Sequence, residues 1–227
     1  FYEPFVGKTL EVSKLEQLKD KVSEKVEHFF KKLFKKGDIT QGKNLISFEI
    51  AKRYIYNFLD TEIQFLKQGN TVQLLAVEES VALDFDHPDF DFPIKLKGNV
   101  DRIDVCNGVR RIIDYKTSKA SQTDLNLVDW APIVQDYKKH NKSFQLLMYA
   151  YILNQTHPFD GPTEVGIFSF KNFKSGVIKF TKKDKPGNGA SKQQQISEEI
   201  LQSYETQLGA LLSELFNPDI EFIEKEV

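Results

Sequence analysis

The dipeptide Asn107–Gly108 is the feature that most constrains how this chain of 227 residues folds. Asn-Gly between two runs of apolar and β-branched residues is the strongest short signal for a hairpin with a two-residue turn. The flanking runs are residues 94–105 and 109–117, so we expect two antiparallel strands there. A turn of this length fixes the register and places Ile103 opposite Ile112.

This register brings charged side chains together. Asp104 faces Arg111, which makes an ordinary cross-strand ion pair, whereas Asp101 faces Asp114. Two directly opposed carboxylates destabilise a sheet, so either one of them holds a proton or a cation lies between them. The run over residues 112–115 is apolar apart from Asp114, and burying an unpaired charge in such a strand costs free energy. We therefore favour a functional site over a solvated hairpin.

Lys116 belongs to the same group of side chains. It faces Asn99 in this register and lies on the sheet face of Asp101 and Asp114, because side chains alternate along a strand. Paired carboxylates with room for water are the ligands that Mg²⁺ or Mn²⁺ prefers. Lys116 would orient or activate an attacking water, or stabilise charge developing on a phosphate.

The remaining pattern predicts an α/β or α+β protein. Ser13 to Glu16 has the form of a capping box and opens an amphipathic helix that we expect to extend to Lys36. Residues 118–141 form a polar, irregular connection. The other expected elements are a helix over 44–66, a strand over 72–85, a helix over 143–154, a second hairpin over 164–171 and 176–182, and a helix over 196–216.

Composition excludes several classes of protein. Lys and Arg number 31 against 33 Asp and Glu, so the chain is not generally basic, although a local basic groove remains possible. The single cysteine, Cys106, excludes a disulfide framework and an iron–sulfur cluster built from this chain alone, and it agrees with a reducing, cytoplasmic setting. No run is apolar for the length of a membrane span, so we expect no membrane association.

The motif Gly98-x-x-Asp-Arg-Ile-Asp104, then Ile112-Ile-Asp-Tyr-Lys-Thr117, then Gln145-x-x-x-Tyr149 resembles the RecB/AddB-type branch of the PD-(D/E)XK nucleases. The motifs cover roughly residues 94–150, and the order of elements agrees over the whole chain. The resemblance implies a restriction-endonuclease-like mixed central sheet flanked by helices, with an N-terminal helical insertion. It also implies one domain over 1–227, helical over 1–70 and with its sheet core over 71–227.

The same resemblance assigns roles to individual residues. Asp101 and Asp114 match the acidic metal ligands, Lys116 the catalytic lysine, and the backbone carbonyl of Tyr115 a further ligand of Mg²⁺ or Mn²⁺. Gln145 and Tyr149 match a motif beside the site that helps to arrange it and the DNA. They share a helix face at this spacing, although a helix side packed on the sheet is an alternative role for them.

The resemblance is incomplete in one respect. Related nucleases carry a metal-binding His before the helical insertion, and we expect that residue upstream of Phe1. An inactive isolated chain is therefore one of the outcomes that the sequence predicts. None of the histidines fits that position: His28, His87, His140 and His157. Glu78 is a candidate substitute ligand, with a solvent-facing strand residue as the equally weighted alternative. Related proteins can also hold an iron–sulfur cluster near the C-terminus, but this chain ends before any such cysteines.

Three lysines on the second hairpin, Lys171, Lys174 and Lys179, are candidate contacts for a DNA backbone, although such lysines more often form a solvated strand face. The sequence thus predicts a Mg²⁺- or Mn²⁺-dependent deoxyribonuclease, with an exonuclease favoured. We expect it to be part of a longer helicase–nuclease or recombination-repair protein, with DNA, the rest of the polypeptide and a helicase subunit as partners. The alternatives are a non-catalytic copy of the fold that binds DNA or serves as a scaffold, and a purely structural metal site.

Overall fold

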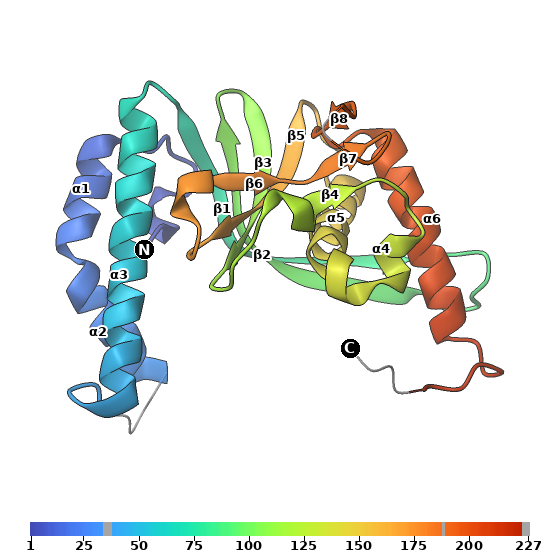
Figure 1. Cartoon of the computed structure of the whole chain (residues 1–227), viewed down its shortest axis with the longest axis horizontal. Coiled ribbons are helices and arrows are strands. Elements are labelled where there is room, and N and C mark those ends of the chain that lie inside the picture. Colours follow the sequence, from blue (N-terminus) through green and yellow to red (C-terminus); the bar gives the residue numbers. More distant parts are fainter. Residues whose placement is uncertain (34–37, 188, 224–227) are drawn as a thin grey trace.

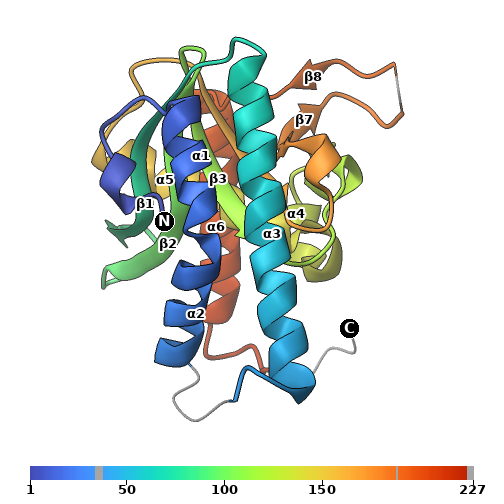
Figure 2. The same cartoon turned by 90° about the vertical axis from the view of Figure 1, so that its left-hand side faces the viewer.

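The computed structural model describes residues 1–33, 38–187 and 189–223. A mixed five-stranded sheet lies at the centre of the molecule, between an N-terminal group of helices and a second group, which comes from the connection between two of the sheet strands and from the C-terminal helix (Figure 1). Figure 2 shows the N-terminal helices lying side by side in front of the sheet.

The N-terminal group is an antiparallel helical arrangement. It consists of a 3₁₀ turn, η1 (Glu3–Phe5), and the helices α1 (Val12–Asp20), α2 (Val22–Leu33) and α3 (Gly42–Lys67). Leu15 and Val22 are fully buried, and they pack in one cluster with Leu59 of α3. The apolar stripe predicted from the sequence therefore faces α3.

Two details of this region differ from the prediction. The first helix begins at Val12, with Glu11 before it and no side-chain cap, so the capping box at Ser13 is wrong. The helix is also interrupted at Lys21, whose N–H binds the carbonyl of Leu18 in a tighter turn. The predicted end at Lys36 lies outside the described residues.

The central sheet follows the predicted strands closely. Its members, in spatial order, are β1 (Val72–Phe85), β2 (Ile94–Cys106), β3 (Val109–Lys116), β5 (Thr163–Ser169) and β6 (Val177–Lys179). β1 with β2, β2 with β3, and β5 with β6 are antiparallel, whereas β3 and β5 are parallel. A parallel pair needs a long crossover, which here contains α5 (Tyr137–Thr156).

The second group of elements is more structured than the sequence indicated. Residues 118–141, expected to be irregular, contain several short elements, and a small second sheet of β4, β7 and β8 completes this side. The predicted strand over 176–182 is divided at the fully buried Phe180, so that β6 and β7 belong to different sheets. The elements are η2 (Gln122–Leu125), β4 (Asn126–Leu127), α4 (Pro132–Gln135), η3 (Phe173–Ser175), β7 (Thr181–Lys183), β8 (Lys192–Gln193) and α6 (Glu198–Leu215).

Both faces of the central sheet are covered. On one face, Ile103 and Ile112 pack in the main core with Leu146 of α5 and Leu208 of α6. On the other, Phe58 of α3 packs with residues of β3 and β5. This arrangement confirms the α/β class, with a mixed central sheet flanked by helices. Within the described residues, no helix is both long enough and apolar enough to cross a membrane.

Candidate active site

The hairpin of β2 and β3 has the predicted turn and register. Asn107 and Gly108 both have positive φ, 51° and 83°, as a type I′ turn requires. Ile103 pairs with Ile112, and the predicted pairing of Asp104 with Arg111 is confirmed. The Arg111 guanidinium donates to both oxygens of that carboxylate, at 2.7 and 2.8 Å.

The ladder ends one residue before the predicted carboxylate pair. The last pair of the ladder is Arg102 with Ile113, so the expected direct opposition of Asp101 to Asp114 is wrong. Asp101 Oδ2 instead accepts a hydrogen bond from the N–H of Tyr115 at 2.6 Å. The carboxylate takes a backbone donor that would otherwise bond to the partner strand. The strands separate at this point, and their acidic side chains remain close.

Asp114 is the most buried of the candidate residues, with 4% of its surface exposed. Its Oδ2 lies 2.9 Å from Nζ of Lys116 and has no hydrogen-bond partner other than this amine among the described residues. Burial raises the pKa of the Asp114 carboxyl and the charge of Asp101 adds to the rise, while Lys116 opposes it. The two carboxylates therefore interact, as the sequence predicted, although not as a ladder pair.

Helix α5 completes the arrangement from the face that carries Asp114 and Lys116. Gln145 Oε1 accepts from Nζ of Lys116 at 2.8 Å, so the predicted contact of Lys116 with Asn99 is replaced. Gln145 Nε2 donates to the hydroxyl of Tyr149 at 2.7 Å. The Tyr149 ring lies against Gly98, where a Cβ would come within 2.6 Å of a ring carbon. The Gly98, Gln145 and Tyr149 positions thus form one connected unit with Lys116.

Glu78 lies near Asp101 on the neighbouring strand β1. It has a φ of 52°, which is uncommon outside glycine and is found where a special geometry is held. Glu78 and Asp101 line a shared cavity of about 640 Å³ between the sheet and the N-terminal helices. The Glu78 side chain accepts from Asn99 at 2.9 Å. Its placement is compatible with a supporting ligand or with an acidic residue at the mouth of the cavity.

The candidate lysines do not lie together. Lys179 pairs with Glu164 at 2.7 Å, and both line a groove on the α3 side of the sheet that Lys174 also lines. Lys171 is exposed and follows the end of β5, close to Lys116, because the N–H of Phe170 binds the carbonyl of Lys116.

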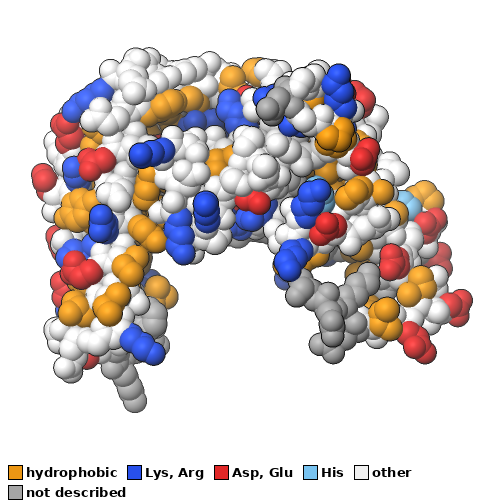
Figure 3. Space-filling view, in the orientation of Figure 1, with side chains coloured by type: hydrophobic (Ala, Val, Ile, Leu, Met, Phe, Trp, Pro, Cys, Tyr) orange, Lys and Arg blue, Asp and Glu red, His pale blue; other side chains and the backbone are white. Residues whose placement is uncertain are grey.

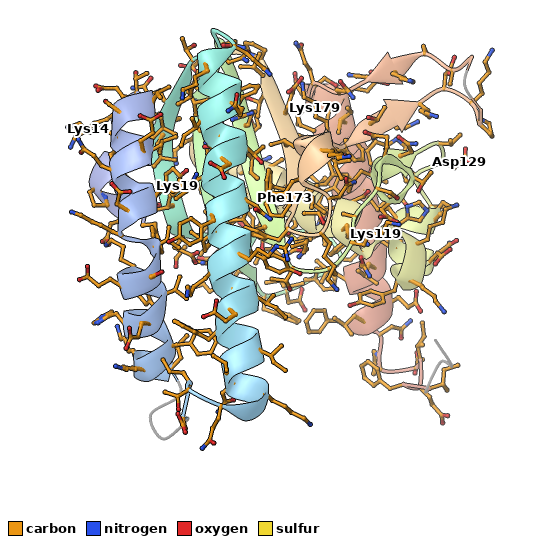
Figure 4. All side chains as sticks on the ribbon, turned by 60° about the vertical axis from the view of Figure 1, so that its left-hand side comes forward. Lys14, Lys19, Lys119, Asp129, Phe173 and Lys179 are labelled. Carbon is orange, nitrogen blue, oxygen red and sulfur yellow. The ribbon has the colours of Figure 1, made fainter. Side chains whose placement is uncertain are left out.

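The sequence interpretation missed a further lysine, Lys119, in the loop after β3. This loop is joined to the end of β5 by a hydrogen bond from Ser169 Oγ to the Ser118 carbonyl, at 2.8 Å. Lys119 is exposed, and Figure 4 shows it on a different part of the surface from Lys179. The sequence did contain a signal for this lysine, because it lies in the first loop after the Asp-x-Lys motif.

The four histidines lie on other elements than the acidic pair. His28 is an exposed residue of α2, His87 stacks on Phe85, and His140 is buried at the start of α5. His157 caps the end of α5. Among the described residues, no three His, Cys, Asp or Glu side chains form a cluster able to hold a metal ion.

The acidic pair nevertheless fits a divalent cation. A buried carboxylate with a raised pKa and a like-charged neighbour is relieved by a cation more completely than by a single lysine. Oxygen donors of this kind suit Mg²⁺ or Mn²⁺. Asp101, Asp114 and the carbonyl of Tyr115 are the groups that would hold it.

A mixed sheet with two acidic side chains and a lysine at the point where its strands separate defines a nuclease-like α/β domain. The model of the PD-(D/E)XK nuclease superfamily matches residues 2–226, so the chain belongs to this superfamily. The resemblance noted from the motifs is thereby confirmed at the level of the superfamily. Its members generally use divalent metal ions.

Other comparisons add little detail. No curated protein matches the sequence. A crystal structure of a candidate exonuclease from Eubacterium rectale is similar, with a TM-score of 0.42 and 13% identity over 89% of this chain. The alignment covers 66% of the length of that protein.

Proposed function

We propose that this domain is a Mg²⁺- or Mn²⁺-dependent nuclease that hydrolyses DNA phosphodiesters. The observation that carries the proposal is the buried Asp114, which lies beside Asp101 and within 2.9 Å of a lysine that a helix holds in place. A buried carboxyl group whose pKa is raised, next to a second acidic side chain and a lysine, is typical of an active site.

The groups of the proposed site have separate roles in the reaction. When bound, a divalent cation would supply positive charge at the scissile phosphate. Lys116 has three N–H donors, of which Asp114 and Gln145 take two. The third is free to donate to a phosphate oxygen or to orient the attacking water. Gln145, fixed by Tyr149, keeps the amine at this position.

The wider context is also a proposal. The motifs favour a RecB/AddB-like nuclease with exonuclease activity, acting as one domain in the cytoplasm within a longer recombination-repair protein. DNA, the rest of that polypeptide and a helicase subunit are the partners that such a role requires.

A second candidate function is a copy of the fold that binds DNA without cleaving it. The observation that favours it is the small number of clustered ligands. In the part of the chain that the structure describes, no group of three or more His, Cys, Asp or Glu side chains could hold a metal ion. A nuclease of this type needs enough ligands to hold the cation during turnover.

Titration calorimetry with Mn²⁺, followed by cleavage of end-labelled DNA, tests the proposal. We expect Mn²⁺ to bind and Asp114→Ala to abolish the binding. Lys116→Ala should retain binding but lose cleavage by at least about a hundredfold, the scale of general acid–base and electrostatic effects. Lys95→Ala, on an exposed pair with Asp84, is the matched control and should cleave normally.

The possible results separate the candidates. Mn²⁺ binding without cleavage, even in the presence of Mg²⁺, would favour the non-catalytic copy. Equal cleavage by the parent protein and Lys116→Ala would contradict the proposed role of the lysine. Binding that survives in Asp114→Ala would place the metal elsewhere.

A further inference from the structure

We propose that Arg102 and Glu62 are positioning residues, which act from the α3 side of the sheet to hold the Tyr115 peptide and the Asp101 carboxylate in place. The inference rests on the proposed function, because it gives these residues a purpose at that site. It assigns to helix α3 a direct part in the geometry of the acidic pair.

Arg102 lies next to Asp101 in the sequence and points to the α3 side of β2, where it meets Glu62. It is 1% exposed, although it carries a full charge. Its Nε donates to Asp104 at 2.6 Å, and its Nη1 donates to Glu62 of α3 at 3.0 Å. The same Nη1 lies 3.3 Å from the hydroxyl of Tyr115. One guanidinium thus joins β2, β3 and α3.

Tyr115 is held at both of its ends. Its ring hydroxyl contacts Arg102, and its backbone N–H donates to Asp101 at 2.6 Å. The ring also packs edge-on against Phe58 of α3, with centroids 5.5 Å apart. A displacement of the ring moves the peptide, and a displacement of the peptide moves the Asp101 oxygen that accepts from it.

Stability alone does not account for this network. The buried charges are Arg102 and Arg111 against Asp104 and Glu62, and replacing such groups by well-packed apolar residues is often neutral or stabilising. Arg102 Nη2 is buried with no hydrogen-bond partner among the described residues. Such a network defines geometry more than it adds stability. The geometry that it defines here is that of the strand ends carrying Asp101 and Asp114.

Hydrogen exchange of the Tyr115 amide, measured by NMR on this chain without metal, tests the inference directly. Tyr115→Phe removes the hydroxyl and keeps the ring, so we expect exchange at position 115 to be about tenfold faster, the effect of one hydrogen bond of ordinary strength. Glu62→Gln keeps the shape and removes the charge, and should give an increase in the same direction. Tyr151→Phe is the matched control, because it also loses a phenol contact to a carboxylate, Glu205, on the other side of the sheet.

A second readout separates this inference from the proposed function. If the parent protein binds Mn²⁺, Tyr115→Phe should raise its Kd by about tenfold, the usual effect of losing a group that orients a metal ligand, and Tyr151→Phe should not. If the parent protein binds no Mn²⁺, the proposed function fails, while the exchange rates still decide whether the network holds Tyr115. Unchanged exchange at position 115 in both variants, with only a lower midpoint of thermal unfolding, would overturn the inference.

Discussion

At the scale of single residues, Asp114 is a buried carboxyl group whose ionisation is unfavourable in the metal-free protein. Burial raises its pKa, with Asp101 adding to the rise, so the folded protein holds the proton more tightly than the unfolded chain does. As pH rises through the interval between the two pKa values, the metal-free protein loses stability. An ionised Asp114 at neutral pH is therefore a cost that a bound cation would relieve.

Asp114→Asn should consequently stabilise the metal-free protein at pH 7. The gain in the midpoint of thermal unfolding should shrink as the pH falls from the raised pKa of the folded protein to the pKa of the unfolded chain, because Asp114 becomes neutral over this interval, and little of it should remain below. Calorimetry with a chelator present, from pH 3.5 to 8, measures it. The exposed Asp84→Asn is the control, and a lower midpoint for Asp114→Asn at pH 7 would show that the pair with Lys116 outweighs burial.

The sequence anticipates these residues only in part. Alternation along the two predicted strands places Asp101, Asp114 and Lys116 on one face, because the turn at Asn107–Gly108 fixes the register. The observed ladder confirms that register as far as Arg102 and Ile113, and Asp101 itself lines the cavity on the α3 side of the sheet. The end of the ladder could not be predicted, since it depends on Asp101 capturing a backbone donor. Glu62 was missed for a related reason: nothing local in the sequence says which buried charge on a distant strand will meet a helix.

At the scale of elements, the packing of α5 on β2 determines where Lys116 lies. The Tyr149 ring occupies the space that a side chain at position 98 would fill. Tyr149 fixes Gln145, and Gln145 fixes the amine. A change in β2 is thus transmitted through the helix to β3.

Gly98→Ala should therefore slow DNA cleavage by about tenfold or more, because misplacing a group by about 1 Å has effects of that order. The slower cleavage should appear mainly as a lower kcat, because Asp101 and Asp114 keep their own contacts in this variant. Gly161→Ala is the matched control: its Cβ would meet nothing within 4 Å, and its φ is not in the left-handed region. Equal rates for the two variants would show that Tyr149 can shift without moving Lys116.

Elements also show which patterns carry information. The long strands β1, β2 and β3 were predicted almost to the residue, because each has a strong apolar pattern between clear turns. The second sheet was missed, since β4 and β8 have two residues each and no periodicity can be seen in so few. Helix α5 begins six residues before its predicted start at Ser143, with Asp136 capping it by accepting from the N–H of Lys139 at 3.1 Å.

At the scale of the whole molecule, the helices on either side of the sheet form an arch over a hollow. Figure 3 shows Lys and Arg side chains along the underside of this arch, although the net charge of the chain is only -2. A local concentration of positive charge of this kind attracts a phosphate backbone even when the protein as a whole is slightly acidic. Lys171 and Lys119 are both exposed, and their loops meet beside Lys116.

DNA binding should therefore depend on Lys171 and not on Lys179. Each lysine that contacts a phosphate displaces condensed counterions, so its loss reduces the slope of log K against log salt concentration by about 0.9 for duplex DNA, or about 0.7 for single strands. Lys171→Gln should show that reduction in fluorescence anisotropy titrations between 50 and 200 mM salt with Ca²⁺, which prevents turnover. Lys179→Gln should not, because Glu164 neutralises Lys179 in the groove beside α3, where Figure 4 shows Phe173 next to that helix.

The opposite result would relocate the substrate path. A reduced slope for Lys179→Gln with an unchanged slope for Lys171→Gln would mean that DNA lies along the α3 side of the sheet. The groove there has a volume of about 810 Å³, but Arg111 in its lining is already bound to Asp104 and Lys179 to Glu164. Two of its positive charges are thus neutralised within the protein, which leaves Lys174 as the exposed lysine of this groove. A phosphate backbone gains more beside Lys171 and Lys119, which are exposed and lie close to Asp114 and Lys116, and this difference in free charge is the reason for placing the DNA there.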